Sequence, residues 1–197
     1  MEMKNENTES EFRIFNGDIF LRDMCMQDIN DYIIWNTTEV EWQDWDAPWE
    51  KEEVNIEDLK NSLLKRLNKT VPEIRRRLEI CTVEGSHIGW VSSYNIDGNK
   101  ERLAVGIDIP SKSYRGKNMG KSALILFISY LLKAGFLSDI YTQTWSGNYR
   151  MISLAESCGF KIVASEMNCR EVRGSRYHGL TFKLNKDLFW DRFKHLE

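Results

Sequence analysis

The residues most able to do chemistry in this 197-residue chain lie in a basic, glycine-containing segment, Arg115-Gly-Lys-Asn-Met-Gly-Lys-Ser122. It follows the alternating pattern Gly106-Ile-Asp-Ile-Pro110 and precedes a strongly apolar run over residues 122–132, which predicts a strand, a loop and a buried helix. The first N–H groups of a helix have no helical acceptor and lie at the positive end of its dipole. The segment therefore predicts a phosphate site. The alternative is an ordinary basic turn between a strand and a helix.

Two phosphate-binding motifs fit this loop poorly, and a third fits better. A P-loop would need a glycine where Arg115 stands, although Gly120-Lys-Ser122 matches its second half. The dinucleotide fingerprint needs glycines that the loop lacks. The loop resembles the pyrophosphate loop of the GNAT superfamily of N-acetyltransferases, Arg/Gln-x-x-Gly-x-Gly/Ala, with Asn118 replacing the first glycine. This departure is mild, because Asn tolerates the left-handed backbone conformation better than most residues.

A second segment supports the same resemblance. Trp145-Ser-Gly-Asn148 is followed by a helical pattern and then by Gly159-Phe160, which is similar to the Asn, helix and Gly-Phe order common in the family. The resemblance covers residues 78–184. Within the family, the chain looks like the branch that includes the ribosomal-protein N-terminal acetyltransferases.

The order of expected elements agrees with the α/β (α+β) fold that the resemblance implies, a central mixed, mostly antiparallel twisted sheet flanked by helices, with a splayed strand pair that holds the cofactor. We expect a flexible tail over residues 1–11 and a single domain over residues 12–197. Asp28 is expected to cap a helix. The expected strands are 12–15, 19–22, 78–83, 88–96, 103–109, 139–145, 161–171 and 177–184. The expected helices begin near residues 28, 55, 122 and 148, and residues 186–197 are expected to form either a short helix or an irregular tail.

The resemblance also implies a cosubstrate and a reaction. Acetyl-CoA would place its pyrophosphate on the loop and its pantetheine arm against the preceding strand, and its acetyl group would pass to a primary amine. The alternative is a module of the same fold that binds acyl-CoA or a peptide without turnover. The residues assigned to the cofactor are Ile107, Ile109, Arg115, Gly116, Lys117, Asn118, Met119, Gly120, Lys121, Ser122 and Asn148.

The proton-transfer residues are less evident. Many family members carry a Tyr seven residues after the Asn, where this chain has Ala155. Asp108 is the candidate base, because strand alternation turns it away from Ile107 and Ile109. Glu79 and Glu84 are alternatives, as are water relays, and Asp108 could instead be a structural hydrogen-bond acceptor.

Residues 35–53 are rich in tryptophan and acid. Seven acidic residues and one lysine give residues 39–53 a charge of −6. This favours an aromatic, anionic mouth for a cationic acceptor, either a small amine or a peptide N-terminus. The alternative is a loop pinned by its tryptophans, with solvated acids between them.

Composition and charge argue against several other classes of protein. The net charge of −3 and the isolated basic run at residues 75–77 argue against nucleic acid. The four scattered cysteines do not form a metal motif and fit a reducing cytoplasm. Neither a signal peptide nor an apolar run long enough for a membrane span is visible. We allow for a homodimer, because the sequence leaves the oligomeric state open.

Overall fold

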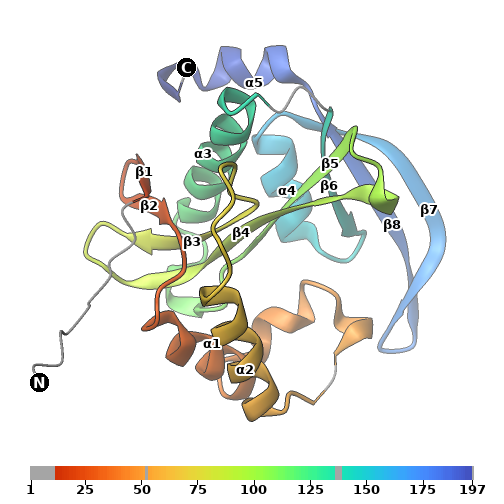
Figure 1. Ribbon diagram of the computed structural model, residues 1–197. Helices are drawn as coiled ribbons and strands as arrows, with labels where there is room; N and C mark the ends of the chain where they lie inside the picture. The colour runs from red at the N-terminus through yellow and green to blue at the C-terminus, as the bar shows by residue number, and fades with distance from the viewer. Residues whose placement is uncertain (1–11, 52, 136–138, 197) are drawn as a thin grey trace, which may run out of the picture.

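The protein is described here by a computed structural model that covers residues 12–51, 53–135 and 139–196; the expected tail over residues 1–11 lies outside the described residues. Eight strands form one sheet in the order β1-β2-β3-β4-β5-β6-β8-β7 (Figure 1). The strands are β1 (Arg13–Asn16), β2 (Ile19–Arg22), β3 (Arg77–Thr82), β4 (His87–Asn95), β5 (Arg102–Asp108), β6 (Asp139–Trp145), β7 (Phe160–Val172) and β8 (Ser175–Leu184).

Five α-helices and several short 3-10 helices complete the fold. Two of the short helices, η1 (Val40–Asp44) and η2 (Pro48–Glu50), lie in the tryptophan-rich acidic segment. The α-helices are α1 (Asp28–Thr37), α2 (Ile56–Leu67), α3 (Met119–Lys133), α4 (Tyr149–Ser157) and α5 (Lys186–Arg192). Within the described residues, none of these helices is long and apolar enough to cross a bilayer.

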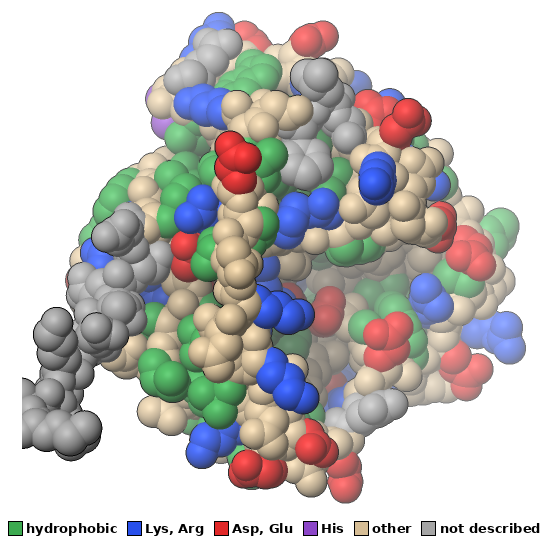
Figure 2. Space-filling model, viewed as in Figure 1, with side chains coloured by type: hydrophobic (Ala, Val, Ile, Leu, Met, Phe, Trp, Pro, Cys, Tyr) green, Lys and Arg blue, Asp and Glu red, His purple; other side chains and the backbone are tan. Residues whose placement is uncertain are grey.

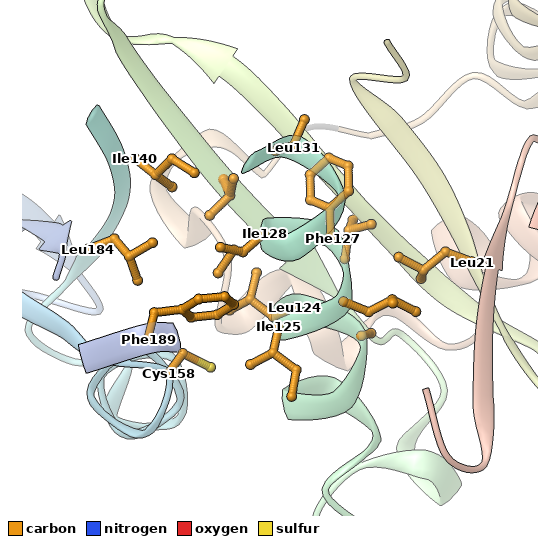
Figure 3. Packing of buried hydrophobic residues seen from close by; sticks show 14 of the residues in the cluster. Leu21, Leu124, Ile125, Phe127, Ile128, Leu131, Ile140, Cys158, Leu184 and Phe189 are labelled. Atoms are coloured by element: carbon orange, nitrogen blue, oxygen red, sulfur yellow. The ribbon is translucent and has the colours of Figure 1, made fainter. Parts of the chain in front are cut away.

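The helices divide between the two faces of the sheet (Figure 1). On one face, α3 packs against the strands through Leu124, Phe127 and Leu131, and α4 and α5 close the same core through Cys158 and Phe189 (Figure 3). On the other face, a smaller cluster joins residues of α1 and α2 to the sheet. The two faces therefore meet different sets of helices, and a ligand that reaches both must pass through the sheet.

Most of the predicted elements are confirmed within one to three residues. The predicted mixed, mostly antiparallel sheet flanked by helices is also confirmed, because β5 and β6 pair in parallel while every other pair is antiparallel. The α3 connection makes that parallel pair feasible, since parallel strands need a long crossover.

One local prediction is wrong. Asp28 does not cap α1 but is its first residue, after Gln27. Its carboxylate instead accepts two hydrogen bonds from Arg22, at 2.6 and 2.7 Å, and one from the Cys25 N–H at 2.8 Å. A buried ion pair thus takes the oxygens that a cap would have used.

Candidate active site

Strands β5 and β6 separate part-way along their length. Their parallel pairing covers Arg102 to Ala104 on β5 and ends at the pair Ala104–Tyr141, whereas β5 stays paired with β4 as far as Asp108. The β6-facing edge of β5 beyond Ala104 therefore has backbone groups without a strand partner. This opening confirms the predicted splayed strand pair.

A cavity of about 1110 Å³ runs through this opening. On the α3 face it is lined by Ile107, Ile109 and Gly120, and on the α1 face by Trp90 and Asp108. Figure 2 shows this side of the molecule hollowed between the sheet and the segment that follows α1. One cavity thus connects the start of α3 with the opposite face of the sheet.

The loop before α3 is shaped as the sequence predicts. Asn118 adopts the left-handed conformation, with φ 61°, and its side chain makes no capping hydrogen bond to α3. Ser122 donates the first helical hydrogen bond, to the Asn118 carbonyl at 3.0 Å. The N–H groups of Met119, Gly120 and Lys121 precede that bond, so they have no acceptor within the helix. Free N–H groups at a helix start are suited to hold a phosphate, and these three are named the cradle.

The structure brings most of the predicted cofactor residues to the cavity, but not all of them. Those that line it are Ile107, Ile109, Arg115, Gly116, Asn118, Gly120, Lys121 and Asn148. Lys117 lies over the Tyr114 ring at 5.7 Å, Met119 packs against the core, and the carbonyl of Ser122 accepts a bond from Asn16. None of these three residues lines the cavity.

The Arg115 guanidinium makes most of its contacts with other residues of the protein. Its Nε donates to the Ile109 carbonyl at 2.8 Å, and its Nη2 donates to the Pro110 carbonyl. Its Nη1 lies 3.5 Å from Glu41 Oε1. The guanidinium therefore ties the loop to the end of β5 and to the acidic segment, in addition to placing charge near the cradle.

Asn148 joins two walls of the cavity. Its Oδ1 accepts from the Met151 N–H at 3.0 Å and caps α4, while its Nδ2 donates to the Trp45 carbonyl at 2.6 Å. Trp145 Nε1 donates to the same carbonyl at 2.9 Å. Asn148 thus holds the acidic segment against the end of β6.

Asp108 lies on the α1 side of the sheet, as its alternation with Ile107 and Ile109 predicts. It is partly buried, and the side chain of Trp90 donates a hydrogen bond to it. Burial raises the pKa of Asp108 to about 8, and the charge of Asp46 adds to the rise, while Arg77 and the Trp90 bond oppose it. A carboxylate with this pKa can take and release a proton near neutral pH.

The alternative bases lie elsewhere. Glu79 is buried behind Trp90, where Arg66 and Tyr32 bond to its carboxylate. Glu84 is exposed in the β3–β4 turn. Neither residue lines the cavity, so Asp108 is the candidate that the geometry favours.

Behind Asp108, aromatic side chains pack against one another and against a guanidinium group. Trp90 stacks on Tyr32 at 5.1 Å, and the Arg77 guanidinium lies 4.6 Å from the Trp90 ring and donates to the Tyr32 hydroxyl at 2.8 Å. His87 lies next to this stack and bonds both Asp31 and Glu79. Trp90 and Arg77 were not among the predicted site residues. The register of the predicted hairpin could have done so, since it brings Trp90 opposite Asp108.

The acidic segment divides into paired and unpaired carboxylates. Glu41 lies within 3.6 Å of Lys112 and Asp44 within 3.2 Å of Arg173, so both are neutralised by basic residues of the chain. Among the described acids of the segment, only Asp46 lines the cavity. The Trp42 side chain holds the segment by donating to the Trp35 carbonyl at 2.8 Å, and one acid reaches the cavity, so a mouth for a cationic acceptor stays a prediction.

A family model of the acetyltransferase (GNAT) domain matches residues 18–161, which is more than half of the chain. The chain belongs to the GNAT acetyltransferase family. A search of curated proteins finds no match.

Solved GNAT structures share this fold over most of the chain. A GNAT-family acetyltransferase from Bacillus anthracis gives a TM-score of 0.71 at 13% identity, covering 89% of this chain and 99% of its own. RimL, a ribosomal-protein alpha-N-acetyltransferase solved with coenzyme A, gives 0.72 at 11%, covering 87% and 97%. A spermidine N-acetyltransferase from Vibrio cholerae, solved with CoA and spermine, gives 0.70 at 18%, covering 86% and 96%. At these identities the likeness establishes the fold.

Acetyl-CoA is the cosubstrate characteristic of the GNAT family. The residues of this chain fit it. The α3 N–H groups without helical acceptors suit a pyrophosphate, and the unpaired edge of β5 suits the amide groups of a pantetheine arm. Gly120 leaves the approach open, since a Cβ there would meet only Ile109 and Ile107 side chains at 3.4 and 3.8 Å.

Proposed function

We propose that this protein transfers the acetyl group of acetyl-CoA to a primary amine, either a small cationic amine or a peptide N-terminus. One observation carries the proposal. A single cavity leads from the first turn of α3, through the gap between β5 and β6, to Asp108 on the other face. A cosubstrate held on the α3 side can therefore meet an acceptor that arrives from the α1 side.

Different residues of the chain have different roles in the proposed reaction. Bound acetyl-CoA supplies an acyl group activated as a thioester. The N–H groups at the start of α3 bind its pyrophosphate. A β5 N–H aimed at the reacting carbonyl would stabilise developing negative charge, by about 2.7–4 kcal/mol in comparable sites. Asp108 accepts the proton that an ammonium acceptor loses before its nitrogen can attack.

The acceptor half of the cavity favours a cation with an apolar body. Trp42, Trp45, Trp90 and Tyr94 line it together with the carboxylates of Asp46 and Asp108. Aromatic faces attract ammonium groups, and the carboxylates match their charge. These walls support an amine acceptor over a neutral alcohol.

Calorimetric titration with acetyl-CoA, free CoA and NADH is the first test. Saturable binding of both CoA species but not of NADH supports the cradle, and thiol release with a panel of amines then tests turnover. Replacing Asp108 with Asn should lower kcat by about 10²–10⁴-fold without weakening acetyl-CoA binding. Binding of acetyl-CoA without thiol release over the whole panel would favour the non-catalytic module, and no CoA binding by the folded protein would refute the cradle.

A further inference from the structure

Asp46 is brought to the cavity by contacts across the sheet. The carbonyl of Trp45, its neighbour, accepts hydrogen bonds from both Asn148 and Trp145, which follow it by about 100 residues. The Trp45 ring is held as well, because Tyr149 packs edge-on against it at 5.1 Å. The backbone before Asp46 is therefore fixed, and its exposed carboxylate lines the same cavity as Asp108.

Among the described residues, the charges around this pair come from five elements, one of which is α4, whose Arg150 lines the same cavity and lies 4.0 Å from the centre of the Trp45 ring. Asp108 on β5 interacts with Asp46 and, with opposite sign, with Arg77 on β3. Asp46 also interacts with Glu50 of η2 and with Tyr94 of β4. Although Asp46 is exposed overall, the cavity walls around its carboxylate partly desolvate it, and this raises its pKa together with the charge of the nearby Glu50. Two like charges that line one cavity resist ionising together, so the two carboxyl groups titrate as a coupled pair.

We propose that Asp46 determines acceptor specificity, acting with Asp108 as a carboxylate pair that selects an amine arriving as an ammonium ion. This inference rests on the proposed function. Asp46 pairs with the ammonium at the wall of the cavity and strengthens Asp108 as a base, because its negative charge favours the protonated form of Asp108. A neutral amine gains nothing from either effect.

The protons, bonds and electron pairs of the proposed transfer can each be accounted for. In the reactive form both carboxylates of the pair are ionised, and their charge attracts the ammonium. The ammonium gives one proton to Asp108, and the nitrogen lone pair forms the bond to the acetyl carbon as the carbon–sulfur bond breaks. Sulfur keeps that electron pair and takes a second N–H proton, which leaves an amide and the free thiol. The pair then releases one proton to solvent and returns to its starting state.

The variants D46N, D46E and D44N separate this role from a structural one. Asp44 lies in the same segment, but it pairs with Arg173 and does not line the cavity, so D44N is a matched control. Two matched acceptors serve as probes: n-butylamine, an ammonium at pH 7, and aniline, which is neutral there. We expect D46N to raise KM for n-butylamine about tenfold and to leave KM for aniline unchanged, D46E to restore the wild-type value, and D44N to have no effect.

The pH dependence of kcat/KM distinguishes this role from a loss of packing, which would not change that dependence. With Asp108 titrating near pH 8, wild-type kcat/KM for n-butylamine should rise about tenfold from pH 7 to pH 9. In D46N this ratio should fall towards one, because Asp108 then ionises at lower pH. NMR titration of carbon-13-labelled aspartate follows the same shift without an acceptor: a carboxyl signal that titrates near pH 8 in the wild type should titrate lower in D46N.

Two outcomes would overturn the inference, and they differ from failure of the proposed function. One is a wild type that turns over n-butylamine while D46N keeps the same KM and pH profile. The other is an NMR titration in which D46N leaves the aspartate signals unshifted. A wild type that binds no acetyl-CoA would refute the proposed function itself, and the inference would fall with it.

Discussion

Gly89 gives the sharpest test of how the fold places Asp108. A Cβ at this position would lie 2.0 Å from the Asp108 carbonyl oxygen and 3.0 Å from its carbonyl carbon. Both atoms belong to the backbone, so no side-chain rotation relieves the clash. Gly89 directly precedes Trp90, the cross-strand partner of Asp108, and it lies beside an irregularity in the β3–β4 register. A methyl group here must push β5 away from β4 at Asp108, the proposed base.

The expected size of the effect follows from that geometry. Carbon and oxygen need about 3 Å or more, so G89A must displace the Asp108 backbone by about 1 Å. Overpacking of this kind costs about 1–3 kcal/mol of unfolding free energy. A displacement of about 1 Å in a catalytic group can cost about 10²-fold in rate. We therefore expect G89A to lose stability and, among its folded molecules, to lose kcat while still binding acetyl-CoA.

Gly106 provides the control on the neighbouring strand. A Cβ there would meet only the Ser92 hydroxyl at 3.7 Å, an ordinary contact. Because a glycine within a strand costs about 0.5–1 kcal/mol relative to alanine, G106A should be as stable as the wild type or more stable by up to about 1 kcal/mol. Urea unfolding measures the stability of both variants, and thiol release measures their activity. If G89A unfolds at the wild-type urea concentration and keeps the wild-type kcat, the close approach at Gly89 does not position Asp108.

Two further predictions concern stability and cofactor binding. Burial alone would lower the pKa of His87, but its bonds to Asp31 and Glu79 raise it to about 9 from 6.5. Its stabilisation is therefore complete below pH 6.5 and disappears as the pH rises through 9. The difference in unfolding free energy between wild type and H87Q should shrink by about 3 kcal/mol from pH 6 to pH 10 in urea titrations, and an unchanged difference would contradict the raised pKa. G120W should weaken acetyl-CoA binding about tenfold or more in calorimetry, because its side chain obstructs the α3 N–H groups, while its urea midpoint should change little. G120A is the control and should bind acetyl-CoA normally. Equal affinity of G120W and the wild type would argue against the cradle.

Local signals explain how much of the fold was predictable. Strands β3, β4 and β5 are six, nine and seven residues long and are joined by short connections that contain Gly85 and Gly98, so their pairing depends on neighbours in sequence. The cradle was predictable for the same reason, because a helix start offers free N–H groups whatever the rest of the chain does. Asn118 even adopts the left-handed conformation that its substitution for glycine requires.

The acceptor side depends on contacts between distant segments, which periodicity does not encode. The position of Asp46 requires the Trp45 carbonyl to meet Asn148 and Trp145, and the sequence cannot show which of seven acids would be placed this way. Asp28 was misplaced for a related reason. Its partner, Arg22, lies on a strand, and the resulting ion pair overrides the capping role that a local pattern suggests.

Ala155 stands where many members of the family carry a tyrosine, and the structure shows its surroundings. Ala155, seven residues after Asn148, is fully buried in the main core and does not line the cavity. The α4 residues that do line it include Ser153, Leu154 and Ser157. The small side chain at residue 155 is therefore accounted for by packing. In the proposed reaction the acceptor nitrogen carries a second proton that the departing sulfur can take, so the proposal places a base at Asp108 and requires no acid on α4.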